Sequence, residues 1–221
     1  MKRPLKKSIA IIGEGETEQA YFSYIRKSRR YPITIKPDLP SNSDFRGIFH
    51  KAEKLSKQDY DLIFCLIDLD VIINNRIINE FLSACSKLSA NIIPIASNPC
   101  TEVWFLMHFT NVTVNHFHKS CDGVVKLLKK NWNHYKKGAG KTNTQDYFHT
   151  LEHVGSMEKA IINSNANIKS VLETEQPFIC TFTEISTIFS QLKICPSCDF
   201  QLNARNAKEL VLQFSWSTTI D

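Results

Sequence analysis

Residues 61–67 read DLIFCLI, a run in which every residue after the aspartate is apolar. A strand that is apolar on both faces has to be covered on both sides, as in parallel sheets that carry helices on each face. Further strands are predicted at residues 7–13, 32–36 and 91–96, with helices between the strands at residues 16–30, 45–57 and 76–88. Because strand and helix alternate, we predict an α/β fold with a mainly parallel sheet flanked by helices.

The pattern becomes helix-rich after about residue 100. Helices are predicted at residues 102–109, 122–132 and 145–164, and we expect Trp104 to pack in the core. We therefore divide the chain into an α/β core at residues 1–110 and a helical or mixed C-terminal part at residues 111–221. This second part is either an extension or an integrated portion of the same domain.

Composition narrows the class of protein. The chain has no run of about 18 apolar residues and no signal-peptide pattern after Met1, so we expect a soluble, cytoplasmic protein without a membrane partner. Its seven cysteines are scattered, and an odd number argues against a fully paired secreted scaffold. We interpret most of them as reduced core thiols.

Basic residues gather in three places, although the net charge is a moderate +5. The clusters lie within residues 2–7, 26–30 and 126–141. Such clusters suit a polyanion such as nucleic acid, because lysine and arginine make most contacts to phosphate. Solvated helix faces are the alternative interpretation of each cluster.

Acidic side chains follow three of the predicted strands. They are Glu14 and Glu18 after the first strand, Asp68 and Asp70 after residues 61–67, and Glu102 after the strand at 91–96. The carboxyl ends of parallel strands meet at one edge of a sheet, so we expect these side chains to converge there. Taken alone, the stretch GEGETE at residues 13–18 also fits a solvated turn before a helix.

Converging carboxylates repel one another unless they are solvated, neutralised by cations or gathered around a metal. Oxygen ligands of this kind suit Mg²⁺ or Mn²⁺, which keep several waters and bridge to phosphate. Two such ions would activate a water and stabilise the leaving oxygen of a phosphodiester. The sequence thus predicts a divalent-metal site for phosphodiester chemistry.

Three segments resemble the RloB family, whose core is a Toprim domain. They are GEGETEQAYF (13–22), LIDLD (66–70) and SNPCTEVWFLMHF (97–109), and together they cover roughly the first half of the chain. The Toprim fold is a compact α/β sheet shared by topoisomerases, primases and overcoming-lysogenization-defect nucleases, and it binds divalent metal through one Glu and an Asp-x-Asp. The sequence departs from the family pattern at Val71 and Thr101, neither of which is an expected ligand.

The resemblance implies a role for each acid. Glu14 corresponds to the Toprim glutamate, Asp68 and Asp70 to the Asp-x-Asp, and Glu18 and Glu102 to further acids of the nuclease branch. All five are therefore expected as metal ligands and catalytic residues.

The resemblance also implies roles around these acids and in the cell. Ser97 and Asn98 would order their loop or bind a water on the second metal. The family further implies an abortive-infection role against phage, often beside a partner ATPase that restrains or triggers the nuclease.

Other polar residues have competing interpretations. His108 is either a general base or phosphate contact, or a satisfied core residue. Lys137 and Lys141 flank a glycine-containing loop that can reach a scissile phosphate, or they are simply solvated. Cys195 and Cys198 have the inner spacing of a zinc site but lack a second ligand pair nearby, so a reduced turn is the preferred alternative.

We expect a Toprim-type, Mg²⁺- or Mn²⁺-dependent endonuclease that cleaves RNA, for example a tRNA, or DNA. One alternative is a non-catalytic module that binds nucleic acid or an ATPase and uses the acids for a structural cation or for docking. Another is a related phosphotransfer such as primase-like synthesis, although no added nucleotide-binding motif is visible.

Overall fold

The computed structural model describes residues 8–30, 33–35, 44–112, 120–137, 144–174 and 177–191. The candidates Lys141, Cys195 and Cys198 lie outside these residues.

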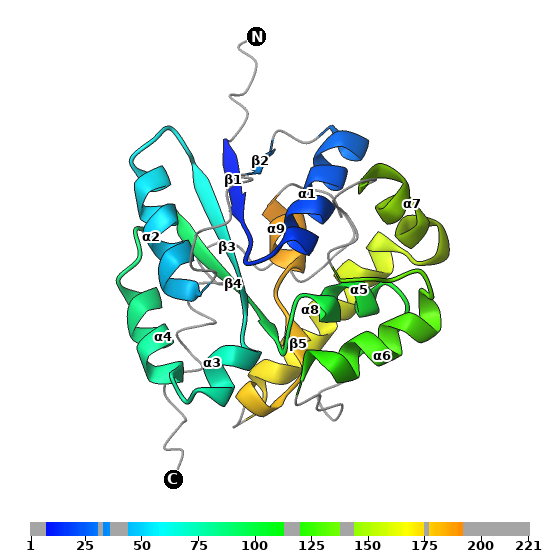
Figure 1. Cartoon of the computed structure of the whole chain (residues 1–221). Coiled ribbons are helices and arrows are strands. Elements are labelled where there is room, and N and C mark those ends of the chain that lie inside the picture. Colours follow the sequence, from blue (N-terminus) through cyan, green and yellow to red (C-terminus); the bar gives the residue numbers. More distant parts are fainter. Residues whose placement is uncertain are drawn as a thin grey trace.

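A single sheet runs through the described part of the chain (Figure 1). Its strands are β1 (Ile9–Ile12), β2 (Ile33–Ile35), β3 (Leu62–Asp68), β4 (Ile92–Asn98) and β5 (Phe182–Thr183). They lie in the order β2-β1-β3-β4-β5, and all neighbouring pairs are parallel except β4 with β5. The predicted α/β fold with a mainly parallel sheet is confirmed.

Helices cover both faces of the sheet. On one face are α2 (Phe45–Ser56), α3 (Asp70–Asn74) and α4 (Ile78–Ser86), seen together in Figure 1. The other face carries α1 (Glu16–Arg29), α5 (Glu102–Met107), α6 (Cys121–Asn131), α7 (Thr144–Val154) and α9 (Ser186–Gln191). Helix α8 (Met157–Leu172) contributes to both cores and is followed by a 3-10 turn, η2 (Pro177–Ile179).

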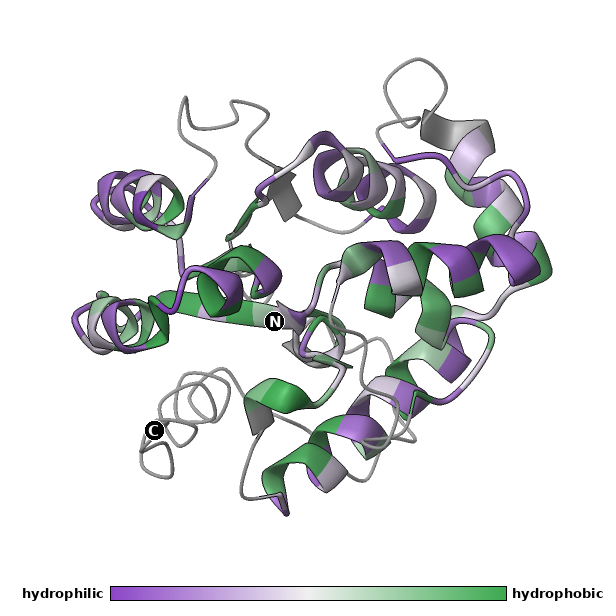
Figure 2. Ribbon diagram, turned by 60° about the horizontal axis from the view of Figure 1, so that its bottom comes forward, coloured by the Kyte–Doolittle hydropathy of each residue, from purple (hydrophilic) through white to green (hydrophobic). Residues whose placement is uncertain are grey.

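The strands divide the apolar residues into two cores because successive side chains point to opposite faces. In β1, Ile9 and Ile11 pack with α1 and α5, whereas Ala10 and Ile12 pack with α2 and α4. Figure 2 shows these hydrophobic strands between helices whose outer sides are mainly hydrophilic. The near-continuous apolar run of β3 is thereby explained, since both of its faces are buried.

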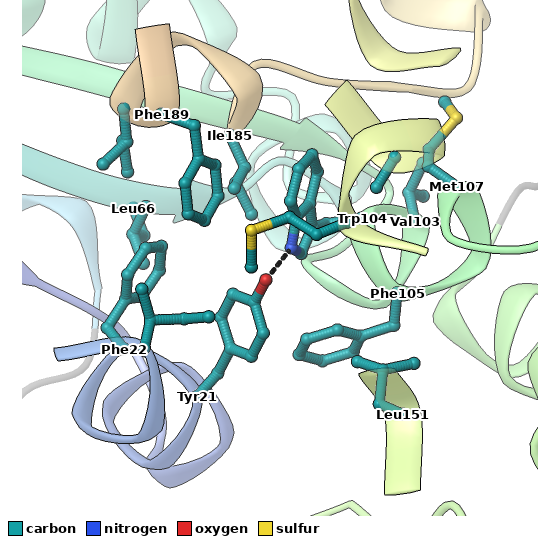
Figure 3. Packing of buried hydrophobic residues seen from close by; sticks show 14 of the residues in the cluster. Tyr21, Phe22, Leu66, Val103, Trp104, Phe105, Met107, Leu151, Ile185 and Phe189 are labelled. Atoms are coloured by element: carbon teal, nitrogen blue, oxygen red, sulfur yellow. Dashed lines mark hydrogen bonds between the residues drawn. The ribbon is translucent and has the colours of Figure 1, made fainter. Parts of the chain in front are cut away.

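A buried hydrogen bond joins helices α1 and α5. The indole Nε1 of Trp104 donates to the hydroxyl of Tyr21 at 2.9 Å, among aromatic rings that include Phe105 and Phe189 (Figure 3). Trp104 is fully buried, so its predicted place in the core is confirmed. Because α1 carries Glu18 and α5 carries Glu102, this contact also holds two of the acids in register.

Two helical features differ from the sequence-based expectation. The single helix predicted at residues 145–164 is two helices, α7 and α8, which break at Gly155 and Ser156. The break has a local cause, because Ser156 caps α8 by accepting a hydrogen bond from the Lys159 amide, and a Cβ at Gly155 would lie 2.9 Å from the Cβ of His108. The short helix α3 was not predicted.

Among the described residues, no helix combines the length and apolar character needed to cross a membrane.

Candidate metal centre

The five acids predicted from the sequence stand at the carboxyl edge of the sheet. They are Glu14 after β1, Glu18 in the first turn of α1, Asp68 at the end of β3, Asp70 at the start of α3 and Glu102 at the start of α5. A direct contact links the ends of β1 and β3, because Glu14 Oε1 accepts a hydrogen bond from the Asp68 amide at 3.2 Å. The structure therefore brings residues from three strand ends to one place.

Backbone contacts hold the ends of β3 and β4 together. The Leu69 amide donates to the Ser97 carbonyl at 2.9 Å, and the Asp70 amide donates to the Pro99 carbonyl at 3.1 Å. These bonds extend the pairing of the two strands into the turn that carries Asp70. The position of this acid is thus set by main-chain geometry.

Thr101 fixes the carboxylate of Asp68. Its amide and its hydroxyl both donate to Asp68 Oδ1, at 2.8 and 3.0 Å respectively. Burial is the main cause of the raised pKa of Glu18, and the nearby Thr101 side chain partly offsets that rise. Thr101 thereby orients one acid and influences the protonation of another.

Two glycines make room for Glu18. A Cβ at Gly13 would lie 2.8 Å from the Cβ of Glu18, and a Cβ at Gly15 would lie 2.8 Å from its Oε2. Such distances are too short for non-bonded atoms, so a larger residue would displace the glutamate. The Gly-Glu-Gly stretch at residues 13–15 therefore leaves the space that the Glu18 side chain occupies.

The acids raise one another's pKa values. Burial is the main cause of the raised pKa of Asp68, and the charges of Glu18, Glu14 and Glu102 raise it further. Burial likewise raises the pKa of Glu14 to about 8, with contributions from Glu18 and Asp70, while the hydrogen bond from the Asp68 amide opposes the rise. Without a cation, the cluster therefore keeps protons at pH values where isolated carboxyls have already lost theirs.

The donor set fits a hard divalent cation. Glu18 is 6% exposed, and its Oε2 is buried without a hydrogen-bond partner. A buried carboxylate oxygen lacking a partner is costly, and a cation would satisfy it. In the described part of the chain, no three of these carboxylates place oxygens within 4.8 Å of one another. Binding of a cation would therefore require the carboxylates to move closer together, a movement that their mutual repulsion opposes.

Glu102 is nearly fully buried and has contacts on both carboxylate oxygens. Its Oε1 accepts a hydrogen bond from the Tyr135 hydroxyl at 2.5 Å and lies 3.9 Å from the Lys137 ammonium. Its Oε2 lies 3.1 Å from the sulfur of Cys121. This surrounding comes from α6 and the segment after it, which the sequence did not connect with the acids.

Cys121 is bonded to Cys100 in a disulfide. The expectation of reduced core thiols is therefore wrong for this pair, although Cys65, Cys85 and Cys180 are buried thiols as expected. The physical reason is proximity that spacing along the chain does not reveal, because α6 returns over the loop between β4 and α5 and brings the two Cα atoms to 5.7 Å. The two sulfurs and a Glu102 oxygen lie within 4.8 Å of one another.

Lys137 is the described cation that faces the cluster most directly. Partial burial lowers its pKa, but the charges of Glu102, Asp68, Glu18 and Asp70 outweigh this and raise the pKa above its ordinary value. The ammonium also lies 4.0 Å from Cys121 Sγ. Lys137 thus lies beside the acids, whereas its expected contact with a phosphate stays a prediction.

Ser97 and Asn98 form the last residues of β4, where a polar loop was predicted. The Ser97 hydroxyl pairs with Thr183 Oγ1 at 2.8 Å, and the Asn98 amide donates to the Phe178 and Cys180 carbonyls at 2.8 and 2.7 Å. These bonds attach β5 and the preceding turn to the sheet. Both side chains therefore order the structure behind the acids.

His108 lies in the core. Its ring is 1% exposed, lies edge-on to Trp104 at 5.5 Å, and both ring nitrogens lack a hydrogen-bond partner. Burial alone lowers the pKa of His108 to about 3, so the ring is neutral near pH 7. The structure thus places this candidate among aromatic residues and does not join it to the acids by any contact.

Sequence reasoning missed three residues around the acids. Asp44 caps α2 through the Gly47 amide, and its charge raises the pKa of Glu14. Tyr135 and Thr101 contact Glu102 and Asp68 as described above. Only Thr101 carried a usable signal, since it directly precedes a predicted ligand.

A family model described as RloB-like protein matches residues 9–192 of the chain. No curated protein and no solved structure matches it significantly.

Proposed function

Because the chain belongs to the RloB-like family, we propose that its acidic cluster binds Mg²⁺ or Mn²⁺ and hydrolyses phosphodiester bonds in a nucleic acid. The three motifs that resemble a Toprim nuclease supply the acids of this cluster. The match covers most of the chain, so the helices after residue 110 belong to the same family unit.

One observation supports the proposal above all others. Carboxyls from β1, β3 and α5 share a buried edge, where the pKa of Asp68 is raised by burial and by Glu18, Glu14 and Glu102. A fold tolerates such repulsion at a functional site more readily than elsewhere, and divalent binding relieves it. The buried, partnerless Oε2 of Glu18 points to the same need for a cation.

Some of these residues would hold the metal ions, and others would orient the ligands or contact the substrate. Glu14, Asp68 and Asp70 would hold the main ion, while Glu18 and Glu102 would support a second. When bound, the metal activates a water and stabilises charge on the phosphodiester. Thr101 keeps the Asp68 carboxylate in one orientation. Lys137, whose ammonium faces the acids, would stabilise the negative charge that develops on a phosphate bound there.

Exposed lysines on α6 offer a path for the substrate backbone. Lys126, Lys129 and Lys130 stand three and four residues apart and therefore share one side of the helix. The chain continues to Lys136 and Lys137, of which the second reaches the acids. We propose that a single-stranded or duplex backbone lies along this row, with RNA and DNA both compatible with phosphate contacts.

The cellular role follows from the family resemblance. We propose that the protein is a cytoplasmic effector of anti-phage defence and that a partner ATPase restrains or triggers its nuclease activity. The lysines of α6 and the five acids fit the chemistry of such an effector. The proposal of an ATPase partner rests on the family resemblance.

The direct test is cleavage of end-labelled total RNA and of plasmid DNA with Mg²⁺, Mn²⁺ or EDTA. Asp68→Asn and Glu14→Gln keep the shape of each side chain but remove its charge, and both are expected to abolish cleavage. Glu16→Gln is the matched control, since Glu16 lies in the same first turn of α1 but is not one of the five expected metal ligands.

Each result separates the proposal from its alternatives. Metal-dependent cutting that is lost in both variants and kept in Glu16→Gln supports a nuclease and identifies its polymer. Nucleic-acid binding that survives Asp68→Asn, without cleavage by the parent even beside an ATPase from the same operon, supports a binding module instead. Nucleotide incorporation without cleavage supports primase-like synthesis.

A further inference from the structure

The disulfide between Cys100 and Cys121 lies directly against one of the acids. Cys100 comes two residues before Glu102, and Cys121 opens α6. Cys121 Sγ is 3.1 Å from Glu102 Oε2. The sulfur pair thus connects the loop after β4 to the helix that leads toward Lys137.

The contact between Cys121 Sγ and Glu102 Oε2 is a hydrogen bond only when the sulfur carries a hydrogen. In the disulfide, Cys121 Sγ carries no hydrogen and cannot donate to Glu102, so Oε2 remains available to a cation. After reduction, the Cys121 thiol can donate to the same oxygen. The other oxygen, Oε1, already accepts from Tyr135, so a reduced site occupies both oxygens of Glu102 with hydrogen bonds.

We propose that Cys100 and Cys121 form a reversible thiol–disulfide pair that controls whether Glu102 can bind a divalent cation, with the oxidised form competent and the reduced form weakened. This inference rests on the proposed function, because it assigns regulation to the same metal centre. Disulfides that form and are reduced again in the cytosol typically have catalytic or redox-sensing roles.

The chemistry balances with a cellular dithiol as reductant. Its first thiolate attacks the sulfur of Cys121, which is the more exposed residue at 9% against 1% for Cys100. A mixed disulfide forms, and Cys100 leaves as a thiolate and takes up a proton. Its second thiol then displaces Cys121 and closes the reductant's own disulfide, and Cys121 takes up a proton. Two electrons and two protons pass to the protein, and the reverse exchange with an oxidised disulfide restores the bond.

The main experiment compares the full-length parent in its two redox states. The oxidised and dithiol-reduced proteins are prepared without free thiol, the state of each cysteine is read by alkylation and mass spectrometry, and Mn²⁺ binding is measured by calorimetry. We expect the oxidised form to bind Mn²⁺ about tenfold more tightly, the scale typical for groups that orient a ligand. Equal affinities in two verified redox states would overturn the switch and leave the proposed metal site intact.

Two substitutions at Cys121 separate the hydrogen bond from the covalent link. Neither Cys121→Ser nor Cys121→Ala can form the disulfide, but only serine can donate to Glu102. We expect weak Mn²⁺ binding by Cys121→Ser and tight binding by Cys121→Ala, each unchanged by reductant. Cys180→Ser is the matched control at a buried cysteine outside the disulfide and should keep the redox response of the parent.

Other outcomes are equally decisive. Equally weak binding by both Cys121 variants, with native circular dichroism, would overturn a mechanism that acts through Glu102. A reduced parent that binds Cd²⁺ through both sulfurs more tightly than Mn²⁺ would show a soft-metal site in place of a switch. Failure of oxidised, reduced and variant proteins alike to bind Mn²⁺ would overturn the proposed metal site itself, and the switch with it.

Discussion

Thr101 donates two hydrogen bonds to the same oxygen of Asp68, one from its amide at 2.8 Å and one from its hydroxyl at 3.0 Å. Thr101 is 2% exposed, so neither donor exchanges its bond readily with water. A carboxylate held by two donors has little freedom to rotate and keeps its second oxygen directed away from them. The two Thr101 hydrogen bonds thus orient the Asp68 carboxylate as a metal ligand before any cation binds.

Removing only the hydroxyl tests this arrangement. Thr101→Val keeps the amide bond and the shape of the side chain, and we expect it to weaken Mn²⁺ binding about tenfold, because orienting bonds typically contribute on that scale. Thr101→Ser restores the hydroxyl and should bind almost as the parent does. Calorimetric titration of both variants checks this, and equally weak binding by Ser and Val would show that only packing matters.

The stability of the metal-free protein should depend on pH. The folded-state pKa of Glu14, about 8, lies above its ordinary 4.5, so the folded state keeps a proton that the unfolded chain has lost between these values. Its contribution to stability is complete below pH 4.5 and is lost as the pH rises through 8, with a slope of up to about 1.4 kcal/mol per pH unit for each such carboxyl. Calorimetric melting from pH 6.5 to 8.5 should show a falling Tm.

Substitution and metal identify the source of that slope. Asp68→Asn should flatten the fall, because it removes a carboxyl whose own pKa is raised in the folded state. Mg²⁺ should raise the Tm more at pH 8.5 than at pH 6.5. Burial also raises the pKa of Glu184 to about 8, so Glu184→Gln should reduce the slope but leave the Mg²⁺ effect unchanged. His108 contributes only below its ordinary pKa of 6.5, outside this range. An unchanged slope in Asp68→Asn would contradict the prediction.

The two glycines beside Glu18 should differ in their response to alanine. A Cβ at Gly13 meets the Cβ of Glu18, which is fixed to the backbone, so Gly13→Ala should destabilise the protein by about 1–3 kcal/mol. A Cβ at Gly15 meets only the carboxylate end, which can swing away, so stability should change by less than about 1 kcal/mol.

Metal affinity should separate these glycine variants further. Gly15→Ala should still weaken Mn²⁺ binding about tenfold, because the displaced atom is the buried Oε2 of Glu18. Denaturant unfolding and metal titration on the same samples check both parts. Parent-like binding by a folded Gly15→Ala would argue against Glu18 as a ligand.

Lys137 should affect turnover more than folding. Its side chain is 66% exposed but its ammonium faces the acids, so Lys137→Met should lower kcat about a hundredfold with little change in unfolding free energy. Its exposed neighbour provides the control, since Lys136→Met removes the same charge without the Glu102 contact. Steady-state cleavage kinetics distinguish the two. Equal losses, seen mainly in KM, would mean that both lysines only attract the backbone.

Local patterns along the chain were sufficient for the main elements of the fold. The apolar run at β3 and the alternating helices predict a parallel sheet, because a strand buried on both faces requires helices on each side. The same logic brings Glu14, Asp68 and Glu102 to one edge, since parallel strands end together. These inferences depend on short-range periodicity and chain direction, which are properties of sequence.

Contacts between distant segments required the tertiary structure. The return of α6 over the β4–α5 loop joins Cys100 to Cys121 and brings Tyr135 to Glu102, across separations of 21 and 33 residues. No periodicity encodes such meetings, because they follow from how helices pack on the sheet once its strands are paired. The sequence by itself therefore determined which acids lie at the strand ends. Tertiary packing decided their protonation through burial. It also decided their hydrogen-bond partners and the neighbouring disulfide, because it brings together residues that are far apart in the chain.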